Sequence, residues 1–126
     1  MSRKRLEEFV RMLFGLSDDI RYVEVFNRRG VGVAGGMRPG IRSLDPPKTA
    51  AKIDVETANY ALLLMGQRRY YGDMKYMYVE MERVNVLVLP LNGMVAVLTT
   101  NPPTGLELLP ALQQTIAQFT SRGKTG

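Results

Sequence analysis

Residues 75–100 read KYMYVEMERVNVLVLPLNGMVAVLTT and contain three strand patterns in succession. Apolar and polar residues alternate over residues 75–83, which predicts a strand with one covered face. Residues 84–91 are apolar at odd and even positions alike, so we expect a central strand that is covered on both faces. Asn92-Gly93 is a strong hairpin signal, and it leads into a further strand over residues 94–100. A sheet of this kind needs helices on both of its faces.

The chain before this stretch shows a helix, a hairpin and a second helix. Leu6, Phe9 and Leu13 recur at helical spacing and predict a helix over residues 2–16, with Ser2 as its N-cap. Residues 21–26 and 31–34 predict two strands joined by a turn at 27–30. A loop rich in glycine and proline follows from about residue 35 to 47. A second helix is predicted over residues 48–66, with Asp45 able to cap its start.

A third helix is predicted after the strands, over residues 105–121, with Pro110 in its first turn. The resulting order of elements is α-β-β-α-β-β-β-α. It predicts an α+β fold in which a five-stranded antiparallel sheet carries helices on both faces. We expect one domain over residues 1–121 and a flexible tail over residues 122–126.

The helix predicted over residues 48–66 is apolar on two nearly opposite faces. One stripe comprises Ile53, Thr57, Tyr60 and Leu64, and the other comprises Ala51, Val55, Ala58, Leu62 and Met65. A helix with two apolar faces is expected to be buried on two sides. A small single domain covers only one of them, so the other is expected at a subunit interface. We assign the second stripe to that interface, although the pattern leaves open which stripe faces the sheet.

The element order and lengths resemble the roadblock/LC7 domain of the wider profilin-like group, from about residue 5 to 120. The segment that carries the resemblance is Lys75-Tyr76-Met77-Tyr78-Val79-Glu80-Met81-Glu82-Arg83-Val84 with the run to Leu91. Within that group, the chain most resembles small stand-alone archaeal proteins of roadblock-like layout. The resemblance implies helices one and three on one face and helix two on the other. It also implies a homodimer in which the second helices pair and the third strands join, which adds Met77 and Tyr78 to the interface.

Composition limits the chemistry that this chain can perform. Its 126 residues include 17 Lys plus Arg and 12 Asp plus Glu, giving a formal net charge of +5, with no His and no Cys. Without these residues there is no Ser-His-Asp triad, no thiolate metal site and no cysteine nucleophile. Glu80 and Glu82 lack a third clustered acid, so no metal site is expected. We therefore expect a non-enzyme with no catalytic residues and no cofactor. We also expect a cytoplasmic protein, because no apolar run follows the basic N-terminus and none is long enough to span a membrane.

Basic and aromatic residues gather in two stretches of the sequence. The expected partner-binding residues are Arg28, Arg29, Arg68, Arg69, Tyr70 and Tyr71. The second stretch suits either a protein interface, where Tyr is enriched, or single-stranded nucleic acid. Arg28, Arg29, Arg38, Arg42, Lys48 and Lys52 could meet an acidic partner or an anionic membrane surface, or simply be solvated. The Gly30-x-Gly32-x-x-Gly35 pattern is read as structural glycines in a hairpin, because no helix follows it.

The function implied by the resemblance is a dimeric regulatory or scaffolding protein. Many roadblock-like proteins bind small Ras-like GTPases or serve as subunits of larger assemblies, so a GTPase is the partner that the resemblance suggests. Two alternatives stay open. One is a small-molecule-sensing domain with a polar pocket, and the other is a single-stranded nucleic-acid-binding module.

Overall fold

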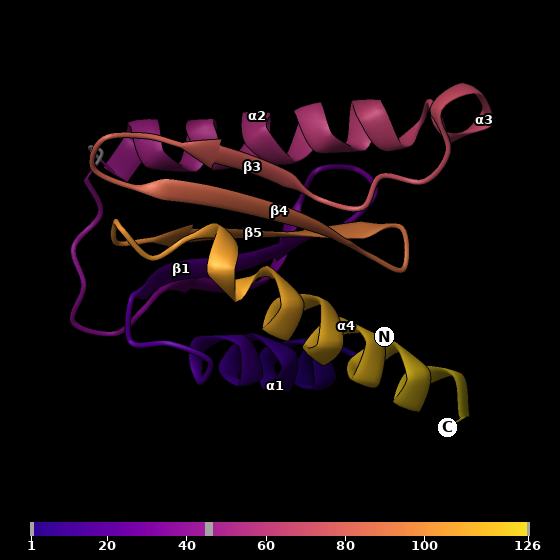
Figure 1. Ribbon diagram of the computed structural model, residues 1–126, viewed down its shortest axis with the longest axis horizontal. Helices are drawn as coiled ribbons and strands as arrows, with labels where there is room; N and C mark the ends of the chain where they lie inside the picture. The colour runs from indigo at the N-terminus through magenta and orange to yellow at the C-terminus, as the bar shows by residue number, and fades with distance from the viewer. Residues whose placement is uncertain (1, 45–46, 126) are drawn as a thin grey trace.

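The computed structural model describes residues 2–44 and 47–125, apart from the side chains of residues 47–51 and 122–125. The described residues form five strands and four helices in the order α-β-β-α-α-β-β-β-α (Figure 1). The elements are α1 (Arg3–Phe14), β1 (Ile20–Phe26), β2 (Gly32–Met37), α2 (Pro47–Met65), α3 (Arg68–Tyr71), β3 (Met77–Glu80), β4 (Asn85–Leu91), β5 (Met94–Thr100), a 3-10 turn (Leu106–Leu108) and α4 (Leu109–Thr125). The predicted α+β class is confirmed.

The five strands form one antiparallel sheet in the order β2-β1-β5-β4-β3. Strand β5 lies at the centre, and β4 is interior with apolar residues buried on both faces, as its sequence predicted. The β4–β5 turn has positive φ angles at Asn92 (49°) and Gly93 (80°). These are the backbone conformations that an Asn-Gly hairpin turn adopts. The register then places Leu91 opposite Met94.

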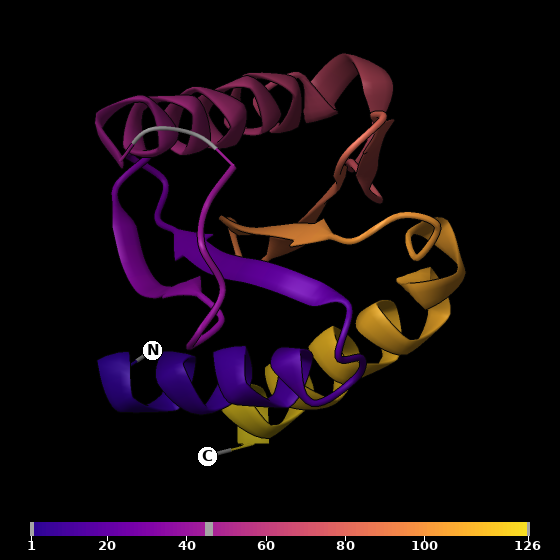
Figure 2. The ribbon, with the colours of Figure 1, turned by 90° about the vertical axis from the view of Figure 1, so that its left-hand side faces the viewer.

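The helices form a layer on each face of the sheet (Figure 2). Helices α1 and α4 cover one face, and α2 covers the other. The predicted first, second and third helices correspond to α1, α2 and α4, so the predicted arrangement is confirmed. The α1/α4 side holds the larger core, built around Phe9, Leu13, Leu89, Leu98 and Leu112. The α2 side holds a smaller core of Tyr22, Phe26, Ala58, Ala61, Val88, Val95 and Val97. Most apolar burial, and so most of the hydrophobic stabilisation, lies on the α1/α4 side.

Several element boundaries differ from the sequence prediction. Strand β2 continues through Gly35-Gly36 to Met37, where a loop was expected, because these residues pair with β1. Strand β3 spans four residues instead of residues 75–83. Helix α3 was not predicted, and α4 starts at Leu109 after a 3-10 turn and continues to Thr125. The proposed Asp45 cap lies outside the described residues. The flexible tail at 122–126 stays a prediction, and its last residue also lies outside them.

Ser2 and Pro110 behave as their positions predicted. The Ser2 hydroxyl accepts a hydrogen bond from the Arg5 N–H at 3.2 Å and caps α1. Pro110 lies in the first turn of α4, where its missing N–H costs nothing. Within the described part of the chain, no helix is both long and apolar enough to span a lipid bilayer.

Arg38 fastens the loop after β2 to the junction between α1 and β1. Its guanidinium donates to the carbonyl oxygens of Phe14, Ser17 and Ile20 at 2.7–2.8 Å. The same group stacks on the Phe14 ring, 4.9 Å from its centroid. A planar fork of N–H donors suits three carbonyls at once, whereas a lysine ammonium does not. Arg38 therefore acts as a structural bracket instead of a free surface cation.

We predict that Arg38→Ala lowers the free energy of unfolding by about 3 kcal/mol, because three part-buried carbonyls lose a charged donor. Arg38→Lys should recover only a minor part. Urea unfolding monitored by circular dichroism measures both. The control is Arg42→Ala, at an exposed side chain in the same loop, for which a change within about 0.5 kcal/mol is expected. Equal losses for Arg38→Ala and Arg42→Ala would contradict the bracket.

Candidate functional site

Helix α2 presents its smallest side chains to the sheet. Ala58 and Ala61 are fully buried, and they let the helix backbone approach the strands closely. Leu62 and Met65 pack against the same core. Three residues of the stripe that we assigned to the interface, Ala58, Leu62 and Met65, therefore face the protein's own sheet. Their side chains pack inside the protomer and not on its outer surface. Val55 is exposed, and the Ala51 side chain lies outside the described residues.

The outer face of α2 is unusual because it exposes large apolar side chains to water. Tyr60 is 57% exposed and Leu63 is 62% exposed, and Ile53 and Val55 are exposed as well. Ile53, Glu56, Thr57 and Tyr60 line an open groove of about 350 Å³ with Met77 and Val79 of β3. We call this surface the outer stripe: Ile53, Thr57, Tyr60 and Leu63 of α2 with Val79 of β3. Neighbouring apolar groups left in water in this way are characteristic of an interaction surface.

Strand β3 forms an edge of the sheet next to the outer stripe. Among the described strands it pairs only with β4, in the register Met77–Val88 to Glu80–Asn85. Its other edge presents unpaired backbone groups, which can pair with another strand. Met77 packs toward α2, whereas Tyr78 packs toward the α1/α4 core. The two residues that we assigned to the interface thus lie on opposite faces of β3, and both are partly buried within the protomer.

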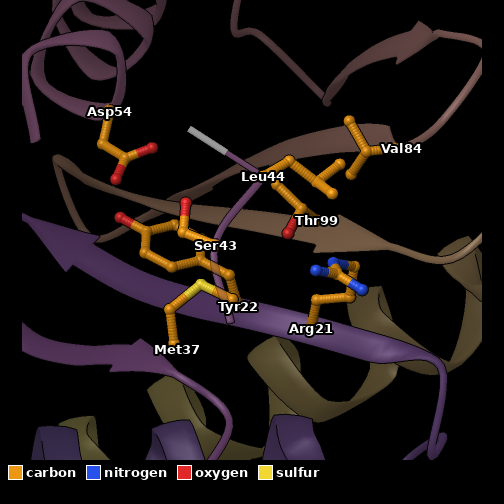
Figure 3. Close-up of a pocket in the computed structure, with 8 residues that line it drawn as sticks. All are labelled: Arg21, Tyr22, Met37, Ser43, Leu44, Asp54, Val84 and Thr99. Carbon is orange, nitrogen blue, oxygen red and sulfur yellow. The ribbon is translucent and has the colours of Figure 1, made fainter. Parts of the chain in front are cut away.

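A polar cluster lies beneath the first half of α2. The Tyr22 hydroxyl donates a hydrogen bond to the Glu24 carboxylate, its neighbour on the same face of β1. Asp54 points from α2 toward the Tyr22 ring (Figure 3). Gly32 leaves the space for Glu24, because a Cβ at that position would lie 2.0 Å from its Oε2. Two carboxylates and a phenol therefore share one part-buried site.

The surroundings shift both titrating groups in the same direction. Burial raises the pKa of Tyr22 far above its ordinary range, and the hydrogen bond and negative charge of Glu24 add to that rise. Burial also raises the pKa of Glu24, against the opposing effect of the Tyr22 hydrogen bond and with help from the charge of Asp54. The phenol is thus held as a neutral proton donor. It cannot serve as a nucleophile or base at neutral pH.

The space beside this cluster is too small for most ligands. Tyr22, Ser43, Leu44 and Asp54 help to line a cavity of about 60 Å³ (Figure 3). Small-molecule sites are typically about 300–1,000 Å³, so this particular cavity does not supply the polar pocket that the small-molecule-sensing alternative needs. Within the described residues, no three acidic side chains gather in a way that could hold a metal ion.

The expected partner-binding residues meet at one end of the molecule. The Arg28 guanidinium lies over the β4–β5 turn, where a Cβ on Gly93 would be 2.5 Å from its Nε. Arg68 borders a groove with Asn92 and Gly93 of the same turn. Arg29 neighbours Arg28 in the β1–β2 turn, and Arg69, Tyr70 and Tyr71 follow Arg68 in α3. Residues 40 positions apart in sequence therefore share a surface.

The second predicted basic group does not form one patch. Arg38 is bound inside the α1–β1 junction, as described above. Lys52 lies in the first half of α2, toward the other end of the sheet, and approaches Glu56 at 4.0 Å. The Lys48 side chain lies outside the described residues. Of these cations, Arg28 and Arg29 join the end that carries α3.

No protein-family model and no curated protein matches the sequence. Solved structures do match. MglB of Myxococcus xanthus aligns with a TM-score of 0.72 and 11% identity, covering 96% of this chain and 88% of that one. A roadblock/LC7 domain from Streptomyces avermitilis aligns with a TM-score of 0.67 and 11% identity, covering 95% and 98%. LokiProfilin1, from its complex with rabbit actin, aligns at 0.52 and 14%, covering 96% and 97%.

The chain therefore has the roadblock/LC7 fold, as its element order indicated. The profilin match agrees with the wider profilin-like group. Identities of 11–14% establish the fold alone.

We predict that Glu24→Gln flattens the pH dependence of stability. The folded protein binds the Glu24 proton more tightly than the unfolded chain does. Its contribution is therefore fully present below the ordinary carboxyl pKa of about 4.3 and is lost as pH rises through the raised pKa. At neutral pH the Gln variant should be more stable than wild type, because it keeps an acceptor for Tyr22 without the charge.

Urea unfolding over a pH series at fixed protein concentration measures this effect. Glu8→Gln, at an exposed residue of α1, is the matched control and should follow the wild-type curve. If the Glu24→Gln curve runs parallel to wild type from acid to neutral pH, the assignment is wrong.

Proposed function

We propose that this chain is a non-enzymatic regulatory or scaffolding protein that acts as a homodimer. The observation that carries the proposal is the outer stripe beside the free edge of β3. A second copy offers the same apolar groups and the same free edge, so a two-fold axis can cover both at once. Interfaces between identical subunits are usually self-complementary in this way.

The physical advantage of such a dimer is twofold. Tyr60, Leu63 and Ile53 leave water, and each contributes in proportion to the apolar area removed. The unpaired backbone groups of β3 gain partners if the two edge strands meet, which also removes an aggregation-prone edge. Likeness of fold to MglB, one structure of which has a tetrameric arrangement, supports assembly between chains of this shape.

We further propose that the partner it regulates is a small Ras-like GTPase. This part rests on the roadblock resemblance and on likeness of fold to the gliding protein MglB of Thermus thermophilus. The chain offers no nucleophile–base pair among its described residues, and Tyr22 is held neutral. An effect on a GTPase would therefore arise by binding one nucleotide state more tightly than the other, which shifts the GTPase between its states.

We predict that wild type sediments as a dimer and that Ile53→Glu with Tyr60→Glu converts it to a monomer of unchanged helicity. Charges placed in the apolar contact carry a desolvation cost that the interface cannot offset. Leu106→Glu is the control, since Leu106 is exposed and lies in the 3-10 turn that leads into α4, the helix on the other face of the sheet from α2, and it should leave the dimer intact. A monomeric wild type at high micromolar concentration would sink the proposal.

For the GTPase we predict a difference in affinity between the GTP-bound and GDP-bound forms of a Ras-like GTPase from the same organism. Allosteric couplings of this kind typically change affinity about 5- to 150-fold. Titration calorimetry with a non-hydrolysable GTP analogue and with GDP measures it. Arg28→Ala with Arg29→Ala should not slow single-turnover hydrolysis, because hairpin-tip arginines are expected to be solvated. Equal affinities for the two nucleotide forms would contradict this assignment.

A further inference from the structure

One end of the sheet carries an excess of positive charge, and the other end does not. The segments at one end, residues 27–30, 66–76 and 92–93, contain Arg28, Arg29, Arg68, Arg69 and Lys75 against a single acid, Asp73. At the other end, residues 15–19, 38–44 and 81–84 contain three acids and three bases, so neither sign of charge is in excess there: Asp18, Asp19 and Glu82 against Arg38, Arg42 and Arg83. The strand register fixes this separation, because Phe26 pairs with Val95 at the basic end and Ile20 pairs with Thr100 at the other.

Tertiary structure brings the basic segments together. Arg28 lies over the Gly93 turn, and Arg68 lines a groove together with Gly93 of the same turn. Helix α3 and the β4–β5 turn lie at the same end of the molecule, on the right of Figure 1. We call this surface the basic tip: Arg28, Arg29, Arg68, Arg69 and Lys75, with Tyr70 and Tyr71.

Two tyrosines project from the basic tip into solvent. Tyr70 is 75% exposed and Tyr71 is 80% exposed, the highest values among the large hydrophobic residues of the described chain. The Arg69 guanidinium lies 5.8 Å from the centre of the Tyr70 ring. Arg68 forms an ion pair with Asp73 at 3.0 Å, so five cations and one acid give the tip a net charge of +4. The tip thus presents cations together with amphipathic aromatic rings.

We propose that the basic tip docks this protein on an anionic lipid bilayer. Each Lys or Arg close to such a surface contributes about 1 kcal/mol of attraction. Tyr side chains favour the membrane–water boundary, because the ring is apolar and the hydroxyl is polar. Five cations and two tyrosines at one end of the fold match that environment. This inference goes beyond the proposed function and needs neither the dimer nor the GTPase.

A bilayer suits the tip better than a folded acidic protein or nucleic acid does. Tyr70 and Tyr71 project into solvent from a four-residue helix and line no described groove, whereas the core of a protein interface normally packs as closely as a protein interior. Single-stranded nucleic acid would use a groove in which successive bases stack, whereas these cations come from two segments that are far apart in the sequence, residues 27–30 and 66–76. A fluid lipid surface adapts to the tip and can touch all of them at once.

The test is co-sedimentation of the full chain with vesicles of phosphatidylglycerol and phosphatidylcholine, compared with pure phosphatidylcholine. Wild type should bind only the anionic vesicles, and less so as salt rises. Arg28→Glu with Arg68→Glu should lower the partition coefficient by about 25-fold or more, since two attractions of about fivefold each are lost. Tyr70→Ser with Tyr71→Ser should weaken binding without changing its salt dependence.

The matched control is Lys52→Glu with Arg83→Glu, which makes the same change in net charge away from the tip. It should retain vesicle binding close to wild type, and circular dichroism should show both charge variants folded. Equal losses for the two charge variants would overturn the proposal, because net charge alone would then explain binding. Failure of wild type to bind anionic vesicles would also overturn it.

Polyuridylate and polyglutamate test the two other classes of partner. If wild type binds either of them more tightly than it binds vesicles, and the tip variant loses that binding, the tip belongs to nucleic acid or to an acidic protein instead.

Discussion

The architecture depends on one constraint, which is that the inner strands of the sheet are apolar on both faces. Leu87, Leu89 and Leu91 of β4 face α1 and α4, while Val88 faces α2. Neither face can be left in water without losing about 25 cal/mol per Å² of apolar surface. Two helices cover one face fully. A single helix, α2, covers the other face, and its backbone must lie close to the strands in order to exclude water.

The close approach of α2 explains why that helix is apolar on two sides. Small side chains, Ala58 and Ala61, bring its backbone near the sheet, and Leu62 and Met65 fill the space around them. The larger apolar residues of α2, Tyr60 and Leu63, then lie on the outside. A helix that only had to cover the sheet would carry polar residues there. The outer stripe is therefore a feature that the fold does not require, which is why we attribute it to a partner surface.

Much of this fold followed from local sequence patterns, and the parts that did not share a physical reason. The interior position of β4, the Asn92-Gly93 turn and the two-sided α2 were readable, because each is a pattern in consecutive residues. The sequence pattern could not predict that β3 ends at Glu80. There, the Asn85 side chain accepts a hydrogen bond from the Met81 N–H at 3.3 Å and diverts the backbone from the sheet. Helix α3 is too short for a periodic signal. The choice between the two stripes of α2 depended on tertiary packing, although the alanines at 58 and 61 are consistent with a close approach to the sheet.

The residues of the polar cluster were harder to predict from the sequence. Glu24 interrupts an apolar strand and was a visible irregularity, but its neighbour Asp54 comes from another element.

The two proposed surfaces differ in the force that drives them, and salt separates them. Association through the outer stripe removes Ile53, Tyr60 and Leu63 from water, and salts that are excluded from protein surfaces strengthen such burial. Attraction at the basic tip is Coulombic between exposed charges, so it weakens once the Debye length, about 8 Å at physiological ionic strength, falls below the separation of the charges. Raising the salt concentration should therefore favour the dimer while it releases the protein from an anionic surface.

The two surfaces are connected in the chain, because α2 carries the outer stripe and leads into α3 of the basic tip. One helix thus joins an apolar surface to a charged one. Because their expected responses to salt are opposite, a salt series separates the two surfaces although they are neighbours in the chain.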